Sequence, residues 1–189
     1  MGTPLLNRRF VVVSGLPGSG KSTIARRLSP LLALPVIDKD DILDRLFNVR
    51  GVGDTAWRRS LSRESDVLFR SEAEGSRGAI LVSFWHQPGM PLDSGTPTDW
   101  LSGLSPLLVT LHCECPLLTA VARFTQRRRH PGHLDELKSY DETLRGIKEV
   151  AELKPVQVGA RVYCDTSFDS DVVALAKNIS EAFRLGCHP

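Results

Sequence analysis

The feature that most restricts the fold of this chain is a glycine-rich segment, GLPGSGKS, at residues 15–22. It matches G-x-x-x-x-G-K-[ST] at every fixed position, follows the apolar run RFVVVSG (9–15) and opens the helix-forming run GKSTIARRLSPLLA (20–33). Glycines let the backbone turn its N–H groups inward, and a helix N-terminus adds positive potential. We therefore predict a strand, a phosphate-binding turn and a helix here; a turn without a ligand is the alternative.

The side chains of this turn have distinct expected roles. Lys21 is expected to bridge the β- and γ-phosphates of a nucleotide, and the Ser22 hydroxyl to bind Mg²⁺. Thr23 is expected near the α-phosphate. The other residues expected to bind the nucleotide are Gly15, Pro17, Gly18, Ser19 and Gly20. ATP and Mg²⁺ are therefore the expected cofactors.

Composition and charge narrow the class of protein. The 189 residues, 41% hydrophobic and 24% charged, fit one globular domain spanning residues 1–189. A net charge of +2 and a pI near 8.4 do not favour nucleic acid as a partner, for which a pI above about 9 is typical. No signal-peptide pattern opens the chain and no run approaches about 18 apolar residues. We therefore expect a cytoplasmic protein that does not bind a membrane.

The four cysteines are Cys113, Cys115, Cys164 and Cys187. Only the first two are close in sequence, as C-x-C, whereas a structural zinc site normally needs two such pairs. We expect buried, reduced thiols, because structural disulfides are rare in the cytoplasm.

Strand patterns alternate with helix patterns along the chain. After the first strand, strands are expected at 34–38, 78–85, 105–116 and 160–167. Helices are expected at 20–33, 40–47, 55–75, 117–129, 134–154 and 169–186, with a loop at 86–100 and a hinge at 130–133. This alternation predicts an α/β fold with five mostly parallel strands, whose ligand lies at the carboxyl ends of the strands.

Three carboxylates, Asp38, Asp40 and Asp41, follow the second strand at the start of a helix. A helix N-terminus favours negative charge, so one of them being only a cap is the alternative. Phosphoryl transfer to a hydroxyl benefits from a carboxylate that accepts the hydroxyl proton. The position of the cluster predicts that it faces the γ-phosphate, and a contact of Asp38 or Asp40 with the metal stays open.

GLPGSGKST followed by D-K-D-D resembles the P-loop kinases related to polynucleotide kinase, chloramphenicol phosphotransferase, zeta toxin and gluconate kinase, often seen as AAA-33 type domains. The resemblance covers most of the chain. It implies a P-loop NTPase fold, a three-layer α/β/α sandwich with a helical lid, and Asp40 as the general base. The polynucleotide kinase pattern continues D-x-x-R, but Leu43 stands at the arginine position and Arg45 follows two residues later. This departure weakens the case for a polynucleotide acceptor.

In these kinases the segment equivalent to ARFTQRRRHPGH (122–133) is a lid, here at about 123–135. We expect its helix to present arginines toward one side: Arg123, Arg127, Arg128 and Arg129. Arg127 and Arg129 are expected to neutralise charge on the transferring phosphoryl group, and Arg123 to face the nucleotide or serve the structure. A solvated basic helix end is the alternative. His130 or His133 is a candidate for contact with substrate.

The third strand lacks the aspartate that commonly holds Mg²⁺ at a strand end, so the metal would depend on Ser22, the phosphates and water. Trp85, His86 and Gln87 are expected to form a wall of the acceptor pocket, with a core position for Trp85 as an equal alternative. YCDTS (163–167) resembles the turn that borders the adenine in P-loop kinases, and a helix cap formed by Ser, Thr or Asp is the alternative.

Together these features predict an ATP-dependent kinase that phosphorylates a hydroxyl of a small molecule. Two other functions stay open: a polynucleotide or RNA-end kinase, and a nucleotide-dependent ATPase or switch that binds a protein. The acceptor would be recognised by the segments at 54–75 and 86–100, which match no pattern that specifies it.

Overall fold

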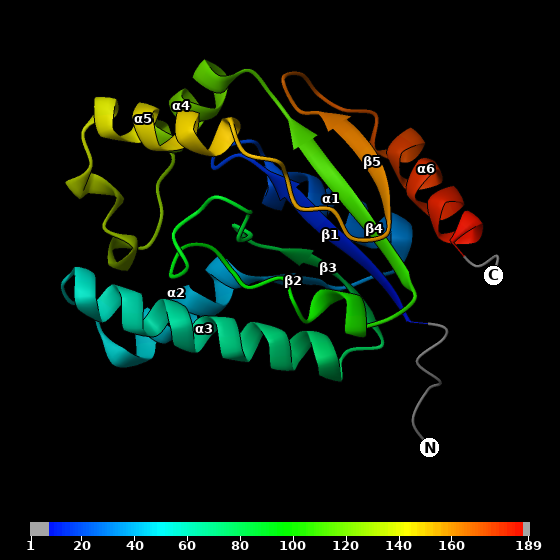
Figure 1. The fold of residues 1–189 in the computed structure, drawn as a ribbon, viewed down its shortest axis with the longest axis horizontal. Coiled ribbons are helices and arrows are strands. Elements are labelled where there is room, and N and C mark those ends of the chain that lie inside the picture. The colour runs from blue at the N-terminus through cyan, green and yellow to red at the C-terminus, as the bar shows by residue number, and fades with distance from the viewer. Residues whose placement is uncertain (1–7, 187–189) are drawn as a thin grey trace.

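The computed structural model describes residues 8–186. In this part of the chain, the sheet has five strands in the order β2-β3-β1-β4-β5. The strands are β1 (Arg9–Gly15), β2 (Val36–Asp38), β3 (Gly78–Val82), β4 (Leu107–Glu114) and β5 (Ala160–Asp165). All neighbouring pairs are parallel, so the carboxyl ends share one edge, toward which the arrow of β4 points in Figure 1.

Within residues 8–186, six α-helices connect or flank these strands. They are α1 (Lys21–Leu32), α2 (Lys39–Arg50), α3 (Thr55–Gly75), α4 (Leu117–Gln126), α5 (Tyr140–Ala151) and α6 (Val172–Leu185). Short 3-10 turns lie at η2 (Leu101–Gly103), η3 (Pro131–His133) and η4 (Asp135–Leu137). The expected α/β fold with a parallel sheet is confirmed.

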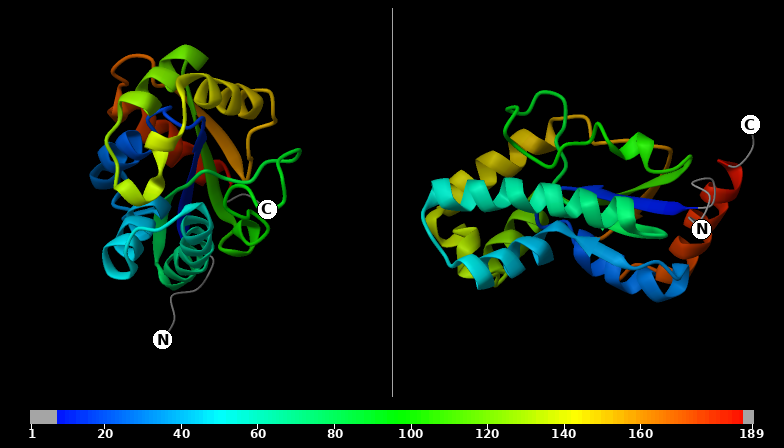
Figure 2. Two further views of the ribbon diagram at one scale, coloured as in Figure 1. Left: turned by 90° about the vertical axis from the view of Figure 1, so that its left-hand side faces the viewer. Right: turned by 90° about the horizontal axis from the view of Figure 1, so that it is seen from below.

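The alternation of side chains along β1 builds three layers. Val11 and Val13 point into a core shared with α1 and α6. Phe10 and Val12 point to the opposite face, where they pack with Phe69 of α3. Figure 2 shows α1 and α6 on one side of the sheet and α3 on the other. A central strand buried on both faces accounts for its unbroken run of apolar residues.

Helices α2 and α3 each begin at an aspartate cap. Asp38 Oδ1 accepts a hydrogen bond of 3.1 Å from the Asp40 amide at the start of α2. Asp54 Oδ1 accepts one of 2.8 Å from the Trp57 amide at the start of α3. Each bond satisfies an amide that the helix itself leaves free. The cap therefore fixes where the three acidic residues of the D-K-D-D segment lie.

The expected helix over 117–129 is wrong at its end, because α4 stops at Gln126 and Arg127 is extended with φ −70° and ψ 143°. The arginines at 127–129 thus follow the helix and do not share one of its sides. The expected helix over 134–154 is also too long, since α5 begins at Tyr140 behind a capping box of Ser139 and Glu142. Leu134, with φ 58°, interrupts any helix before that box.

The third strand is shorter than expected and ends at Val82. Beyond it, Trp85 forms an isolated parallel bridge with Thr96, which closes the base of the loop at 86–95. Cys113, Cys115 and Cys164 are free thiols, and Cys187 lies outside the described residues. Within residues 8–186, no group of three or more His, Cys, Asp or Glu side chains could hold a metal ion. None of the described helices has the length and apolar character of a membrane span.

Candidate active site

The P-loop, residues 15–22, connects β1 to α1 at the carboxyl edge of the sheet. Gly18 has φ +82°, and a Cβ atom there would come within 2.1 Å of the Ala120 carbonyl oxygen, so this position needs glycine. Gly20, with φ +83°, stands at the N-cap of α1 and leaves the first turn without a side-chain cap. The amides of that turn are therefore available to an anion.

Lys21 folds back over the loop. Its Nζ donates hydrogen bonds of 2.9 Å to the Gly15 carbonyl and 2.8 Å to the Leu16 carbonyl. Burial lowers the pKa of Lys21 to about 8, because the ammonium group is withdrawn from water. Both acceptors are neutral, so a phosphate oxygen would be a stronger partner for the cation.

Asp38, at the end of β2, is 4% exposed. Its Oδ2 has no hydrogen-bond partner among the described residues, and Arg26 Nη2 lies 3.8 Å away. Burial raises the pKa of Asp38 to about 6, although the neighbouring Ser22 hydroxyl acts to lower it. A buried carboxylate oxygen without a donor, beside a serine of the P-loop, suits a divalent cation.

Asp40 lies in the first turn of α2. Arg129 Nη1 lies 2.6 Å from Asp40 Oδ2, and the same guanidinium binds Asp135 through Nε at 2.9 Å and Nη2 at 3.0 Å. Exclusion of water raises the pKa of Asp40, but the charge of Arg129 and other nearby cations outweighs it and holds this pKa below its usual range. Asp41, by contrast, is exposed and pairs with Arg26.

Arg127 packs its guanidinium carbon 4.0 Å from the centroid of the Phe124 ring and places Nη2 3.6 Å from Asp135 Oδ2. Asp40 and Arg127 both lie near enough to Lys21 to act on its pKa, which Asp40 raises and Arg127 lowers, so the start of α2, the segment after α4 and the P-loop converge. Arg128 is exposed. The structure thus brings together the expected Lys21, Asp40, Arg127 and Arg129.

Arg123 contacts the turn after β5. It donates hydrogen bonds of 2.9 Å to the Thr166 carbonyl and 3.4 Å to the Ser167 carbonyl. The Thr166 hydroxyl lies 2.7 Å from the Ser19 carbonyl oxygen, which joins this turn to the P-loop. Contact of Arg123 with a nucleotide stays a prediction.

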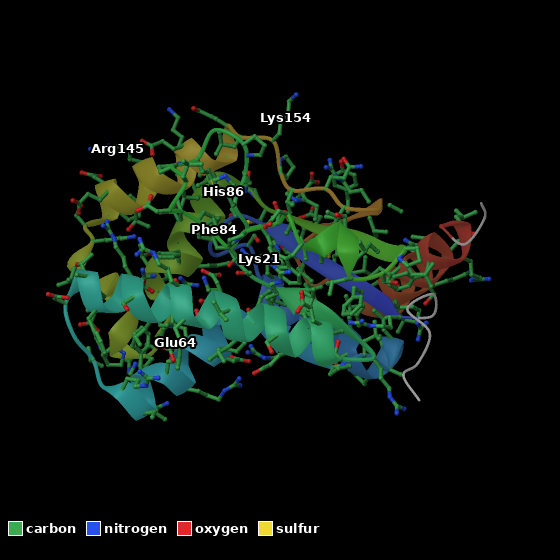
Figure 3. The ribbon with its side chains drawn as sticks, turned by 60° about the horizontal axis from the view of Figure 1, so that its bottom comes forward. Lys21, Glu64, Phe84, His86, Arg145 and Lys154 are labelled. Carbon is green, nitrogen blue, oxygen red and sulfur yellow. The ribbon has the colours of Figure 1, made fainter. Side chains whose placement is uncertain are left out.

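Trp85 does not line the site. It is 2% exposed, and its Nε1 donates a hydrogen bond of 2.8 Å to the Val13 carbonyl, so the core alternative is the right one. His86 Nδ1 lies 2.8 Å from the Ser94 carbonyl oxygen within the loop at 86–95. In the view of Figure 3, the labels of His86, Phe84 and Lys21 follow one another between those of Arg145 of α5 and Glu64 of α3.

Sequence reasoning missed a buried polar chain beside Asp40. Lys39 Nζ lies 2.5 Å from Asp66 Oδ1 of α3, and the Thr96 hydroxyl donates to the same carboxylate at 2.8 Å. Thr96 also lies 2.6 Å from the Ser83 hydroxyl, directly after β3. The only hint in the sequence is the lysine between two aspartates in D-K-D. Its actual partner, Asp66, is brought to it by the packing of α3.

The fold and the site together define a P-loop protein with the fold of the small P-loop kinases. The family AAA_33, described as an AAA domain, matches residues 10–152, which include the P-loop, Asp40 and Arg129. The chain belongs to this family.

Individual relatives resemble the chain over different lengths. A cytidylate kinase of Methanosarcina mazei is 27% identical over 135 residues, 71% of this chain and 72% of that protein. A shikimate kinase of Corynebacterium glutamicum is 51% identical over 72 residues, 38% of this chain and 43% of the relative. The crystal structure of a proposed kinase from Chloroflexus aurantiacus superposes with a TM-score of 0.75 at 20% identity, covering 96% and 98% of the two chains, and supports the fold.

Proposed function

We propose that the protein is an ATP-dependent kinase that transfers the γ-phosphoryl group to a hydroxyl of a small molecule. The observation that carries this proposal is the pairing of Asp40 with Arg129 beside the P-loop. A carboxylate that accepts the hydroxyl proton and an arginine that stabilises the charge of the transferring group both promote this transfer beside the phosphate cradle. Relatives named as kinases support the same class.

In the proposed reaction Asp40 accepts the proton of the acceptor hydroxyl. The acceptor oxygen then bonds to the γ-phosphorus, while the bond from that phosphorus to the β–γ bridging oxygen breaks and ADP leaves. Lys21 exchanges its loop carbonyls for phosphate oxygens, and Arg127 and Arg129 stabilise the charge of the transferring group. Release of Arg129 from Asp40 toward the phosphate leaves the carboxylate free to act as a base.

Ser22 and Asp38 are the residues that would hold Mg²⁺. The Oδ2 atom of Asp38, which accepts no hydrogen bond from the described residues and lies near the Ser22 hydroxyl, fits such an ion. When bound, Mg²⁺ neutralises phosphate charge and orients the γ-phosphoryl group. Asp38 therefore replaces, in this proposal, the aspartate that is missing at the end of β3.

The position of Asp40 favours a hydroxyl over a phosphate acceptor. A phosphate monoester is mostly ionised at neutral pH, because its second pKa is about 6, and it needs no base before attack. An alcohol keeps its proton and gains from a carboxylate at this point. The relatives include both kinds of acceptor, since cytidylate kinase acts on a phosphate and shikimate kinase on a hydroxyl. The net charge of +2 favours a small molecule over a polynucleotide as the acceptor. We also propose that the enzyme is a single domain and acts in the cytoplasm.

The test is ADP formation from ATP and Mg²⁺ with a panel of sugars, hydroxy acids, nucleosides, nucleoside monophosphates and 5′-hydroxyl oligonucleotides. We expect turnover with one of the small hydroxyl compounds. Lys21→Ala should abolish it, while Lys177→Ala, an exposed lysine on α6, should not. Turnover confined to monophosphates or oligonucleotides, or turnover that survives Lys21→Ala, would contradict the proposal.

A further inference from the structure

One face of α2 carries both the proposed base and the contacts of the lid turn. Asp40, Asp44 and Phe47 follow each other at spacings of four and three residues, which places them on the same side of a helix. Each contacts the segment from Arg129 to His133. We refer to His130-Pro131-Gly132-His133 as the HPGH turn.

The HPGH turn is closely packed on that face. The Phe47 ring stacks on His130 at 5.2 Å with an interplanar angle of 14°, and meets His133 edge-on at 5.4 Å. A Cβ atom on Gly132 would come within 2.5 Å of the Phe47 ring, so the turn approaches the ring as closely as a glycine permits. The stack therefore fixes the height of the turn above α2.

His133 fixes the turn along the helix. Its side chain is fully buried, and its Nε2 lies 2.6 Å from Asp44 Oδ1. From α3, Arg58 Nε donates a hydrogen bond of 2.9 Å to the His133 carbonyl. Side chain and backbone of this one residue thus join the lid to both helices of the acceptor side. A fully buried imidazole bonded to Asp44 is not available to touch substrate.

We propose that His133 and Asp44 form a latch that positions Arg129 against the reacting groups. Arg129 lies four residues before His133, and the Asp135 that grips its guanidinium lies two residues after. Since the latch and Asp40 share one helix face, the distance between the lid arginine and the base depends on how the HPGH turn is held on α2, and the His133–Asp44 contact is the polar part of that hold. His133 is a positioning residue, and this role rests on the proposed function.

The test compares variants of the full chain in the assay with ATP and the identified acceptor. His133→Leu should lower kcat by about 10- to 100-fold with a KM for ATP within about threefold, because the P-loop is untouched while the lid group is misplaced. His133→Gln, which keeps an N–H donor near the position of Nε2, should restore kcat to within about threefold. Asp44→Leu should match His133→Leu, and the double variant should be no worse than either, as expected of one shared contact. Asp41→Asn, on an exposed carboxylate of the same helix, is the matched control.

Amide hydrogen exchange supplies a second readout. Exchange over residues 127–135 should accelerate in His133→Leu and Asp44→Leu and stay slow in His133→Gln, with the P-loop amides unchanged. Normal kcat in both leucine variants, additive losses in the double variant, or failure of His133→Gln to rescue would overturn the latch. If His133→Leu does not fold, Asp44→Leu carries the same comparison. A wild-type protein without Lys21-dependent turnover would instead overturn the proposed function, whatever the exchange pattern.

Discussion

Arg129 Nη1 lies 2.6 Å from Asp40 Oδ2, so the charges of the proposed base and of the arginine after α4 offset each other. An ion-paired carboxylate whose pKa is held low is a weak base. Binding of ATP offers Arg129 a more highly charged partner. The same event would therefore bring the cation to the phosphate and free the carboxylate.

Removing the lid arginines should slow the chemical step. Arg127→Met and Arg129→Met should each lower kcat by about 10²-fold or more, by analogy with arginines that stabilise phosphoryl transfer elsewhere. Arg128→Met is the control, because that side chain is exposed between them. Steady-state kinetics with the identified acceptor provide the measurement. Near-normal rates in both single variants and in the double variant would contradict a catalytic role and support the alternative, in which these arginines only form a basic segment in contact with solvent.

Asp40→Asn should lower kcat by about 10²- to 10⁴-fold while the affinity for ATP barely changes, since a general base acts in the transition state. Asp41→Asn should have little effect, because Asp41 pairs with Arg26 at the surface. Kinetics and nucleotide titration of the two variants decide the matter. Loss of activity in Asp41→Asn but not in Asp40→Asn would show that the base is assigned to the wrong residue.

Removing one partner of the Lys39–Asp66 pair should lower the free energy of unfolding strongly. The two side chains are 11% and 19% exposed, so Lys39→Met or Asp66→Leu leaves an uncompensated charge and should cost about 3 to 5 kcal/mol of unfolding free energy. The double variant should recover most of this loss. Chemical denaturation measures it, with Arg45→Met of the exposed pair Arg45–Glu72 as a control expected below about 1 kcal/mol. Equal losses in the single and double variants would contradict the charge argument.

Asp135 should give the lid a dependence on acid. Burial raises its pKa, but hydrogen bonding and charge from Arg129, with Arg127 behind it, lower it below the ordinary 3.8. The stabilisation is thus fully present above about pH 4 and is lost as pH falls further, through the lowered pKa. Arg129→Met should be less stable than wild type by about 2 kcal/mol at pH 7. This difference should shrink below about pH 4 in denaturation curves; a constant difference would exclude Asp135 as its source.

The features predicted from sequence are those encoded by neighbouring residues. The P-loop and the buried strands each depend on a short run of residues with a distinctive pattern. The end of α4 was not predictable in this way, because arginine is tolerated in helix and extended chain alike. After Gln126, Asp135 holds Arg129 and the stack on Phe47 holds the HPGH turn. These contacts stabilise the extended segment more than a further turn of helix would.

Side chains paired across the fold were also beyond sequence reasoning. Lys39 reads as a surface lysine between two aspartates, yet α3 brings Asp66 against it and buries both. His133 reads as a loop histidine, yet it is enclosed by α2 and α3. In both cases the chemistry of the residue is visible in the sequence and its partner is not.

The pairs Asp40–Arg129 and Asp44–His133 each join residues 89 positions apart. During synthesis the P-loop emerges early, but neither pair can close until β4, α4 and the HPGH turn have left the ribosome. Closing a loop of that length costs entropy that only the assembled sheet can offset. A partly made or partly folded chain can therefore contain the phosphate-binding turn without the lid and the proposed base in place. Only the complete fold brings together all the groups that the proposed transfer needs.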